Sequence, residues 1–218
     1  MQSTKENLQV LFEDNHLIII NKRAGDITQG DKTEYVKDKY NKPGNVFIGT
    51  VHRLDRPTSG IVIFARTSKA LERLNKMLRD KTIQKTYWAI VKKTPEITAG
   101  SLTNFLKKDH KKNKSFVYNK AVEGSKIATL HYKVIQKLEN YSLVEIDLET
   151  GRHHQIRTQL SHIGSPIKGD LKYGFDRSNK DGSISLHARK IRFIHPVTKE
   201  EIQITATTPN DSIWNACV

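Results

Sequence analysis

The chain has 218 residues, 36% of them hydrophobic, and its 37 lysines and arginines against 23 aspartates and glutamates give a formal net charge of +14. This length supports one good-sized hydrophobic core, and no apolar run reaches the roughly 18 residues of a membrane span. The lone cysteine, Cys217, excludes an internal disulfide and a cysteine-based metal site. The surplus of positive charge favours a polyanionic partner such as nucleic acid, with solubility alone as the competing explanation.

The N-terminal residues 1–6 lack the charged-then-apolar layout of a secretory signal. Together with the lone cysteine, this predicts a protein of the cytoplasm. We expect a single domain over residues 1–218, because the chain contains no internal repeat, low-complexity linker or other convincing boundary. The oligomeric state is open, and a monomer is the simplest expectation.

The first part of the chain predicts short strands and one amphipathic helix. β-Branched and apolar residues predict strands at residues 8–12, 17–20 and 61–65, the last two buried. Leucines recur at spacings of three and four from Leu71 to Leu78, which predicts a helix capped by Thr67 or Ser68. A short helix is also possible at 33–40.

The second part of the chain predicts a meandering, mainly antiparallel sheet. Strand-like segments occupy residues 85–91, 115–121, 127–136, 142–149, 189–194 and 201–206. Apolar residues at helical spacing from Ile156 to Ile163 predict a helix that ends at Gly164. Strands with few helices indicate the α+β class.

A lysine-rich segment between these strands is the strongest local concentration of charge. It contains Lys107, Lys108, Lys111 and Lys112. Lysines of this kind fit contacts with RNA phosphates, although a solvated face of lysines would produce the same pattern. From length and charge we expect the segments 33–50 and 105–125 to form specificity loops.

The stretch His52–Gly60 places one carboxylate, Asp55, between Arg53 and Arg56 in a turn directly before the predicted strand 61–65. A loop at the end of a buried strand gives a side chain a rigid position at the protein surface, as a catalytic group requires. Taken alone, the same pattern also fits an aspartate that caps a turn and makes a weak surface ion pair.

The residues of this stretch resemble the signature His-Arg-Leu-Asp-x-x-Thr-Ser-Gly of the RluA-type RNA pseudouridine synthases, at all seven specified positions. Gly151–Arg157 resembles the family's Gly-Arg-x-His-Gln-Ile-Arg motif, and Lys85–Ala89 resembles the strand that carries its active-site tyrosine. Leu186–Ala188 and His195–Pro196 resemble its C-terminal signature. The resemblance runs in order over nearly the whole chain.

The chain departs from the family pattern near residue 23. The family usually has Lys-Pro-x-Gly there, so Lys22 and Gly25 match while Arg23 replaces the proline. This departure bears on the shape of that loop rather than on the chemistry.

The resemblance implies an enzyme that isomerises uridine to pseudouridine in structured RNA, ribosomal or transfer. It implies that Asp55 is the catalytic aspartate, that Tyr87 stacks on the flipped-out base, and that Arg157 pairs with Asp55 and keeps it ionised. Two roles for Asp55 stay open, namely nucleophilic attack on the sugar carbon and abstraction of a ribose proton.

Further RNA contacts are expected from polar residues of the same motifs. These are His52, Arg53, Arg56, Arg152, His154 and Gln155. No cofactor is expected, because the isomerisation involves no redox change and no net water. No metal site is expected either, since no ligands stand at metal-binding spacing and adjacent histidines on a helix diverge by about 100°.

The fold that the resemblance implies is a single α+β catalytic domain. It has a large mixed, mainly antiparallel sheet flanked by helices and loops, with the active-site cleft across the sheet. Many relatives carry an N-terminal RNA-binding module of the S4 type, and we expect none in this chain.

Two other functions compete with this interpretation. An RNA N-glycosidase would normally show a second carboxylate as acid or base, and the sequence offers Glu145, Asp147, Glu149 and Asp170 without a comparable setting. A basic RNA-binding protein without catalysis would share the charge, yet it would not need Asp55, Tyr87 and Arg157 together.

Overall fold

The structure is a computed structural model that describes residues 7–28, 34–40 and 46–217. The chain divides into two compact units. The first consists of Met1–Lys85 and His187–Asn215, and the second consists of Thr86–Leu186 and Ala216–Val218.

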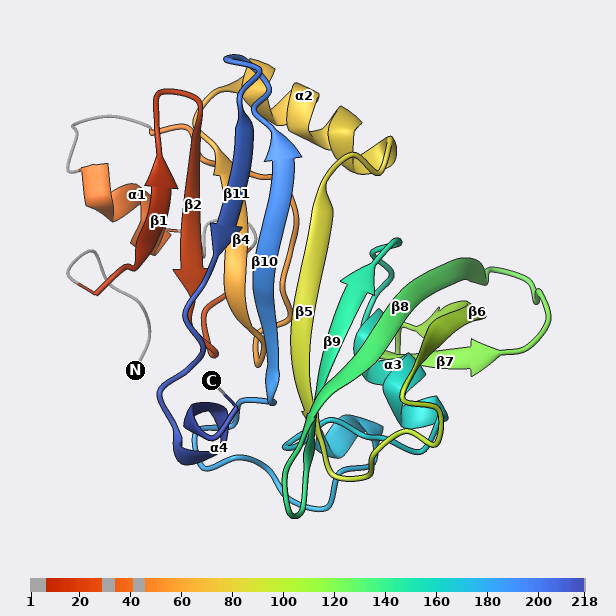
Figure 1. The fold of residues 1–218 in the computed structure, drawn as a ribbon. Coiled ribbons are helices and arrows are strands. Elements are labelled where there is room, and N and C mark those ends of the chain that lie inside the picture. The colour runs from red at the N-terminus through yellow and green to blue at the C-terminus, as the bar shows by residue number, and fades with distance from the viewer. Residues whose placement is uncertain (1–6, 29–33, 41–45, 218) are drawn as a thin grey trace. The chain divides into compact units, whose positions relative to one another are not determined.

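The first unit is built on a mixed sheet (Figure 1). Its strands are β1 (Val10–Glu13), β2 (Leu17–Lys22), β3 (Gly49–Thr50), β4 (Ser59–Ala65), β10 (Leu186–Ile194) and β11 (Glu201–Thr205). Strand β2 lies between β1 and β4 and is antiparallel to both. Strand β10 is parallel to β4 and antiparallel to β11, and β3 pairs with β4.

The core of this unit is formed by the two strands that were expected to be buried. Leu17–Ile20 are fully buried, and Ile61–Ala65 are at most 1% exposed. Both segments are apolar on successive residues, so each strand contributes side chains to both faces of the sheet. The prediction of buried strands at 17–20 and 61–65 is therefore confirmed.

Helix α2 (Ser68–Arg79) follows β4 directly and begins where the sequence predicts. The Thr67 Oγ1 accepts a hydrogen bond from the Ala70 N–H at 3.1 Å, which satisfies one of the N–H groups that a helix start leaves open. Ala70 and Leu74 are buried, and basic residues occupy the outer side. The short helix expected at 33–40 appears in its described part as α1 (Glu34–Lys37) followed by a 3-10 turn at Asp38–Tyr40.

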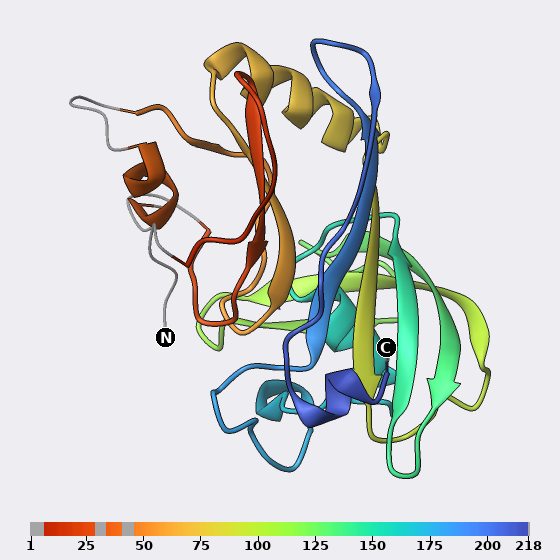
Figure 2. The same ribbon diagram turned by 60° about the vertical axis from the view of Figure 1, so that its left-hand side comes forward.

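The second unit is built on an antiparallel sheet. Its strands are β5 (Gln84–Val91), β6 (Ala99–Asp109), β7 (Lys114–Tyr118), β8 (Lys126–Lys137) and β9 (Ser142–Leu148), in the order β5-β9-β8-β6-β7. Helix α3 (Gln155–His162) packs against β6 and β7, and the turned view shows the same helix in cyan (Figure 2). A 3-10 turn, η3, covers Leu171–Tyr173, and helix α4 (Ser212–Asn215) belongs to the first unit.

The expectation of a loop over 105–125 is wrong for much of that range. Strand β6 continues to Asp109 and β7 starts at Lys114, so Lys107 and Lys108 are strand residues opposite Phe116 and Ser115. Leu106, just before the two lysines, is 4% exposed and belongs to the core. The run of lysines made the alternation of buried and exposed side chains in this strand difficult to recognise from the sequence. The segment 33–50 contains α1 and β3, and its residues 41–45 lie outside the described residues.

The α+β class with a mixed, mainly antiparallel sheet is confirmed. The extent of a single domain over residues 1–218 and the cleft across the sheet stay predictions. None of the helices in the described parts of the chain has the length and apolar character needed to cross a membrane.

Gly60 provides a test of how closely β4 and β10 approach each other. Its φ is +112°, and a Cβ there would lie 2.5 Å from the backbone nitrogen of Ala188. Gly60→Ala therefore combines backbone strain with a clash against backbone, and we expect a much larger loss of unfolding free energy than strain alone gives. Denaturation followed by circular dichroism measures it.

The matched control for Gly60→Ala is Gly182→Ala. Gly182 has a φ of +72°, and nothing lies within 4 Å of the position that a Cβ would take, so only the strain of about 1–2 kcal/mol applies. Equal losses of unfolding free energy in the two variants would contradict the close approach at Gly60.

Candidate functional site

The loop that carries Asp55 lies immediately before β4 in the first unit. Asp55 is half-buried, while Arg53 and Arg56 on either side are exposed. The Thr58 N–H donates to the Asp55 carbonyl at 3.0 Å, which closes the turn predicted there. The structure thus places one carboxylate between two exposed cations at the end of a buried strand.

A buried lysine ties this loop to the turn that follows β2. The side chain of Lys22 is 1% exposed, and its Nζ donates to the carbonyls of Arg23 at 2.7 Å, Asp26 at 3.1 Å and Arg56 at 3.3 Å. The Gly25 N–H also donates to the Arg56 carbonyl, at 2.7 Å. The turn therefore closes with arginine at position 23, where the family usually has proline.

Lys22 also sets the electrostatics beside Asp55. Burial lowers its pKa to about 8, while the negative charges of Asp26 and Asp55 oppose that shift. The ammonium form therefore persists at neutral pH next to the Asp55 loop.

His52 has a structural role in the first unit. Its Nε2 accepts a hydrogen bond from the Ile63 N–H at 3.2 Å, which ties the loop to β4. Burial, with a further contribution from the charge of Lys85, lowers the pKa of His52 to about 3. A neutral imidazole in this position carries no charge to a phosphate, and contact of the half-exposed His52 with RNA stays a prediction.

Tyr87 lies on β5 in the second unit, opposite Ile146 of β9. Tyr87 is 6% exposed. Its neighbours along the strand, whose side chains lie on the other face, hydrogen-bond to acidic residues of β9: Trp88 Nε1 donates to Glu145 at 2.9 Å and Thr86 Oγ1 donates to Asp147 at 2.7 Å. The glycosidase candidates Glu145 and Asp147 are thus engaged by strand side chains.

Arg157 lies on α3 and is held by a carboxylate of the same unit. Its Nε and Nη2 donate to the two carboxylate oxygens of Asp170 at 2.7 and 2.8 Å, and the side chains are 6% and 1% exposed. This two-point pairing fixes the plane of the guanidinium group. Asp170 is therefore a positioning partner of Arg157, a role that its sequence context did not indicate. The pairing of Arg157 with Asp55 stays a prediction.

Tyr173 connects Arg157 to the start of the helix and to β7. The Arg157 Cζ lies 5.1 Å from the centre of the Tyr173 ring, and Lys114 Nζ lies at the same distance. The Tyr173 hydroxyl accepts the Ser115 N–H at 2.8 Å and contacts His154 Nδ1 at 2.9 Å.

His154 occupies a strained backbone conformation directly before α3. Its backbone φ is +53°, a value that residues other than glycine rarely adopt. Its ring stacks on that of His153 with a centroid separation of 3.7 Å. Such strain persists only where surrounding contacts enforce it, and it is common at functional positions. His154 is half-exposed, as an RNA contact requires.

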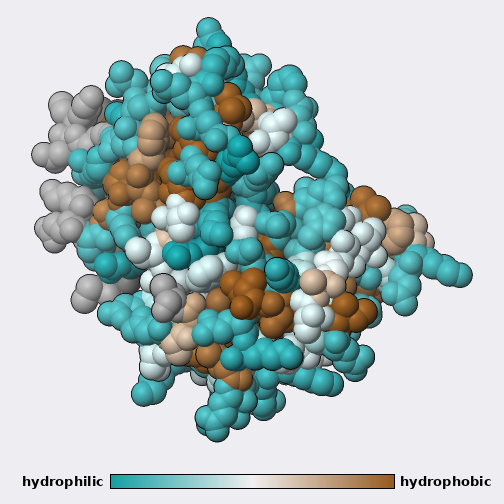
Figure 3. Space-filling view, viewed as in Figure 1, coloured by the Kyte–Doolittle hydropathy of each residue, from teal (hydrophilic) through white to brown (hydrophobic). Residues whose placement is uncertain are grey.

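The lysines of the β6–β7 hairpin are exposed at the surface. Lys107 and Lys108 lie on β6, and Lys111 and Lys112 lie in the turn. Arg152 is half-exposed, with its Nε donating to the Ile127 carbonyl at 2.8 Å. Figure 3 shows that hydrophilic side chains cover most of the face in view, as the net charge of the chain leads one to expect.

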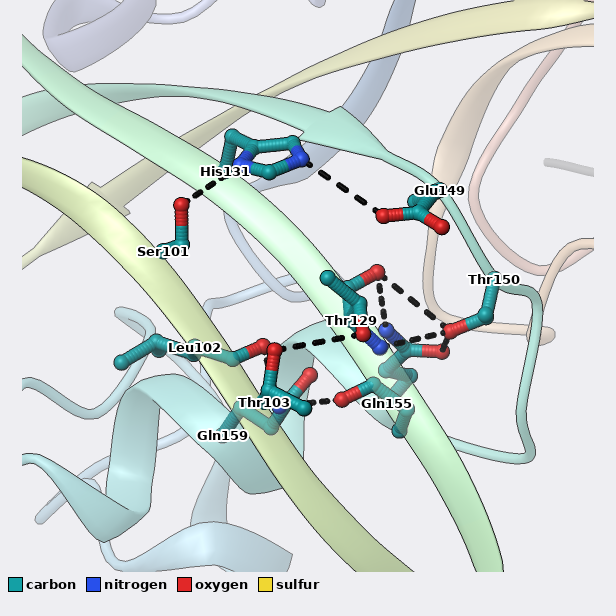
Figure 4. Close-up of polar contacts among 10 residues, drawn as sticks. Ser101, Leu102, Thr103, Thr129, His131, Glu149, Thr150, Gln155 and Gln159 are labelled. Atoms are coloured by element: carbon teal, nitrogen blue, oxygen red, sulfur yellow. Dashed lines mark hydrogen bonds and ion pairs between the residues drawn. The ribbon is translucent and has the colours of Figure 1, made fainter.

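Gln155 is engaged inside the protein. Its side chain accepts from the Thr150 hydroxyl at 2.8 Å and donates to the Thr129 carbonyl at 3.1 Å, contacts that tie α3 to β8 (Figure 4). It is 3% exposed, and Gln159 one turn later donates to strand carbonyls in the same way. Gln155 therefore leaves the set of expected RNA contacts.

Comparison with known proteins gives a consistent result. Residues 16–162 match the family model described as RNA pseudouridylate synthase. An uncharacterised RNA pseudouridine synthase of Bacillus subtilis is 37% identical over 96% of this chain and 71% of that protein. Ribosomal large subunit pseudouridine synthase C of Buchnera aphidicola is 36% identical over 92% of this chain and 67% of its own length. The tRNA pseudouridine synthase C of Vibrio vulnificus is 30% identical over 95% of this chain and 92% of its own length.

Solved structures show the same fold. The human proteins RNA Pseudouridylate Synthase Domain Containing 4 and 1 each align with a TM-score of 0.78 at 22% identity. The alignments cover 96% and 100% of this chain, and 92% and 90% of the human chains. At this level of identity the likeness is evidence for the fold alone.

The lowered pKa of Lys22 predicts how stability depends on pH. Between about 8, its folded pKa, and 10.5, its ordinary value, the unfolded chain binds the proton more tightly, so the unfolding free energy rises with pH. For this one group the rise is at most about 3 kcal/mol. We expect the unfolding free energy of the wild type minus that of Lys22→Met to increase with pH across this window, because methionine does not titrate.

The control for the Lys22 experiment is Lys93→Met, which removes an exposed lysine of the same chemistry. Its difference from wild type should stay constant over the same pH range in denaturation experiments. A flat difference for Lys22→Met as well would show that Lys22 is not desolvated.

Proposed function

The chain belongs to the RNA pseudouridylate synthase family and is an RNA pseudouridine synthase, which is an isomerase. We propose that Asp55 is its catalytic residue. One observation carries the proposal: the residue that matches the aspartate of the family signature is half-buried in a loop whose backbone is held by buried Lys22. A carboxylate with a fixed direction suits a reaction at one sugar carbon.

The reaction breaks the bond between uracil nitrogen and the ribose, rotates the base and joins the same sugar carbon to a carbon of the base. The proton on that base carbon is lost and one is gained on nitrogen, so the reaction is balanced without a cofactor. Asp55 begins it in one of two ways, by attack on the sugar carbon or by removal of a ribose proton. A base inside a helix is inaccessible, so the target is flipped out.

Tyr87 and Arg157 complete the proposed catalytic set. Tyr87 provides an aromatic surface for the flipped base and is supported by its place in the motif of the family strand. Arg157 stabilises negative charge during the reaction, and its bidentate pairing with Asp170 supports a fixed guanidinium.

The exposed cations supply affinity for RNA. The proposed contacts are the exposed Arg53, Arg56, Lys107, Lys108, Lys111 and Lys112, and beside these cations the half-exposed His52, Arg152 and His154. Lysine and arginine contacts to phosphates raise affinity without reading the sequence. Recognition of the target uridine therefore depends on the geometry of the RNA around it.

The proposed substrate is a structured ribosomal or transfer RNA. It is supported by the names of the relatives, among which are a ribosomal large subunit synthase and a tRNA synthase. We propose that the protein acts on it in the cytoplasm, as a monomer and without metal. The chemistry supports the last point, since no step of the isomerisation requires a metal ion.

The substrate and the role of Asp55 can be tested together. In cells lacking the protein, one or a few pseudouridines of ribosomal or transfer RNA should disappear from a transcriptome-wide map. Wild type should restore them and Asp55→Asn should not, because the amide neither attacks nor accepts a proton as the carboxylate does.

The matched control for Asp55→Asn is Asp80→Asn at an exposed position after α2, which should restore modification fully. Purified Asp55→Asn should still bind the target RNA within about threefold of wild type, since phosphate contacts dominate affinity. Restoration of the missing sites by Asp55→Asn would refute the proposal.

The hairpin lysines predict a salt-dependent contribution to RNA binding. Replacing Lys107, Lys108, Lys111 and Lys112 by alanine should weaken binding and reduce the slope of log affinity against log salt by roughly 0.7–0.9 for each phosphate that is no longer neutralised. Titrations at several salt concentrations measure the slope. An unchanged slope, equal to that of a Lys133→Ala/Lys137→Ala control on β8, would place the RNA elsewhere.

A further inference from the structure

A buried serine–histidine pair joins the end of the Asp55 loop to β10. The Ser59 Oγ lies 2.9 Å from His187 Nδ1, and the two residues are 6% and 0% exposed. They are also direct partners in the parallel ladder, where Ser59 faces His187 and Gly60 faces Ala188. Ser59 follows Asp55 closely along the chain, with Arg56, Pro57 and Thr58 between them.

The imidazole of the pair is neutral. Burial is the main cause that lowers the pKa of His187 to about 4, with a smaller contribution from the charge of Arg189. The neutral ring has one nitrogen that donates and one that accepts, and the Ser59 hydroxyl can pair with Nδ1 in either tautomer, as donor or as acceptor. The ring of Trp214 in α4 lies 6.0 Å away, centroid to centroid, in an edge arrangement and confines the imidazole from another side.

The ladder between β4 and β10 is short, so the hydrogen bond between the Ser59 and His187 side chains is a large part of the contact between these two strands. Its register covers two residue pairs, Ser59 with His187 and Gly60 with Ala188. Lys22 holds the loop through the Arg56 carbonyl, upstream of these pairs. The antiparallel ladder with β2 begins one residue later, at Gly60, so the bond between Ser59 and His187 is the side-chain contact at the point where the Asp55 loop enters β4.

We propose that the Ser59–His187 hydrogen bond is a positioning device for the reaction, which holds the Asp55 loop so that its carboxylate keeps one direction toward the ribose. The proposal rests on the role of Asp55 proposed above. In this proposal neither side chain touches the substrate, so Ser59 and His187 are positioning residues. A displacement of about 1 Å at a reacting group slows a reaction by up to about 100-fold, so one buried bond suffices for a large effect.

The test uses the full chain and a transcript that contains the uridine identified in cells. Single-turnover rates at saturating enzyme and equilibrium RNA affinities are measured for wild type, Ser59→Ala, His187→Leu, the double variant and His187→Asn. The asparagine amide reaches about as far as Nδ1, and it pairs with the Ser59 hydroxyl through its oxygen as acceptor or its NH2 group as donor. Thermal melts set an assay temperature at which each variant is folded.

Ser59→Ala and His187→Leu should each slow the single-turnover rate by about 10- to 100-fold, while RNA affinity stays within about twofold of wild type. The double variant should be no slower than the slower single variant, because both remove the same bond. His187→Asn should react within about threefold of wild type. A change of stability alone would not produce this pattern at a temperature where all variants are folded.

Three results would overturn the proposal. They are single variants as fast as wild type, effects that multiply in the double variant, and an asparagine variant as slow as the leucine variant. If His187→Leu does not fold, Ser59→Ala and His187→Asn decide the question. Asp55→Asn, assayed alongside, separates the two proposals. Full activity of Asp55→Asn would refute the role of Asp55, whereas an inactive Asp55→Asn beside fast Ser59→Ala and His187→Leu variants would refute only the positioning role.

Discussion

The first unit depends on a buried ammonium group. Lys22 is almost completely removed from water, and an uncompensated charge in such a place costs several kcal/mol. The carbonyls of Arg23, Asp26 and Arg56 offset that cost, so the turn after β2 and the Asp55 loop are stable only when they close around the same nitrogen. The position of Asp55 is thereby coupled to the packing of the apolar core.

The second unit applies the same principle with a different pair of charges. Arg157 and Asp170 are buried together with two hydrogen bonds, and the ring of Tyr173 lies against the guanidinium. Breaking one partner of such a pair leaves the other charge buried, which makes the arrangement all-or-none. In both units, then, a group proposed to serve catalysis is held by buried polar contacts that must all form at once.

Charge is divided differently at the surface. The cations proposed to bind RNA are exposed on loops, the β6–β7 hairpin and the approach to α3. Exposed lysines contribute affinity through phosphates and little to the stability of the fold. In the proposed function, a buried cation in each unit holds or forms part of the catalytic set, while the exposed cations attract the substrate.

The sequence by itself determined the local features of this protein: the buried strands at 17–20 and 61–65, the helix capped by Thr67, and the family membership carried by the motif around Asp55. Periodicity, capping and short motifs are local properties, so they can be read without a fold. The tertiary structure decided the partners. Asp170 as the partner of Arg157 and the buried place of Gln155 depend on which segments lie together, and spacing along the chain does not encode that. The lysine run misled for the same reason, since only the pairing of β6 with β7 shows which of its residues belong to strands.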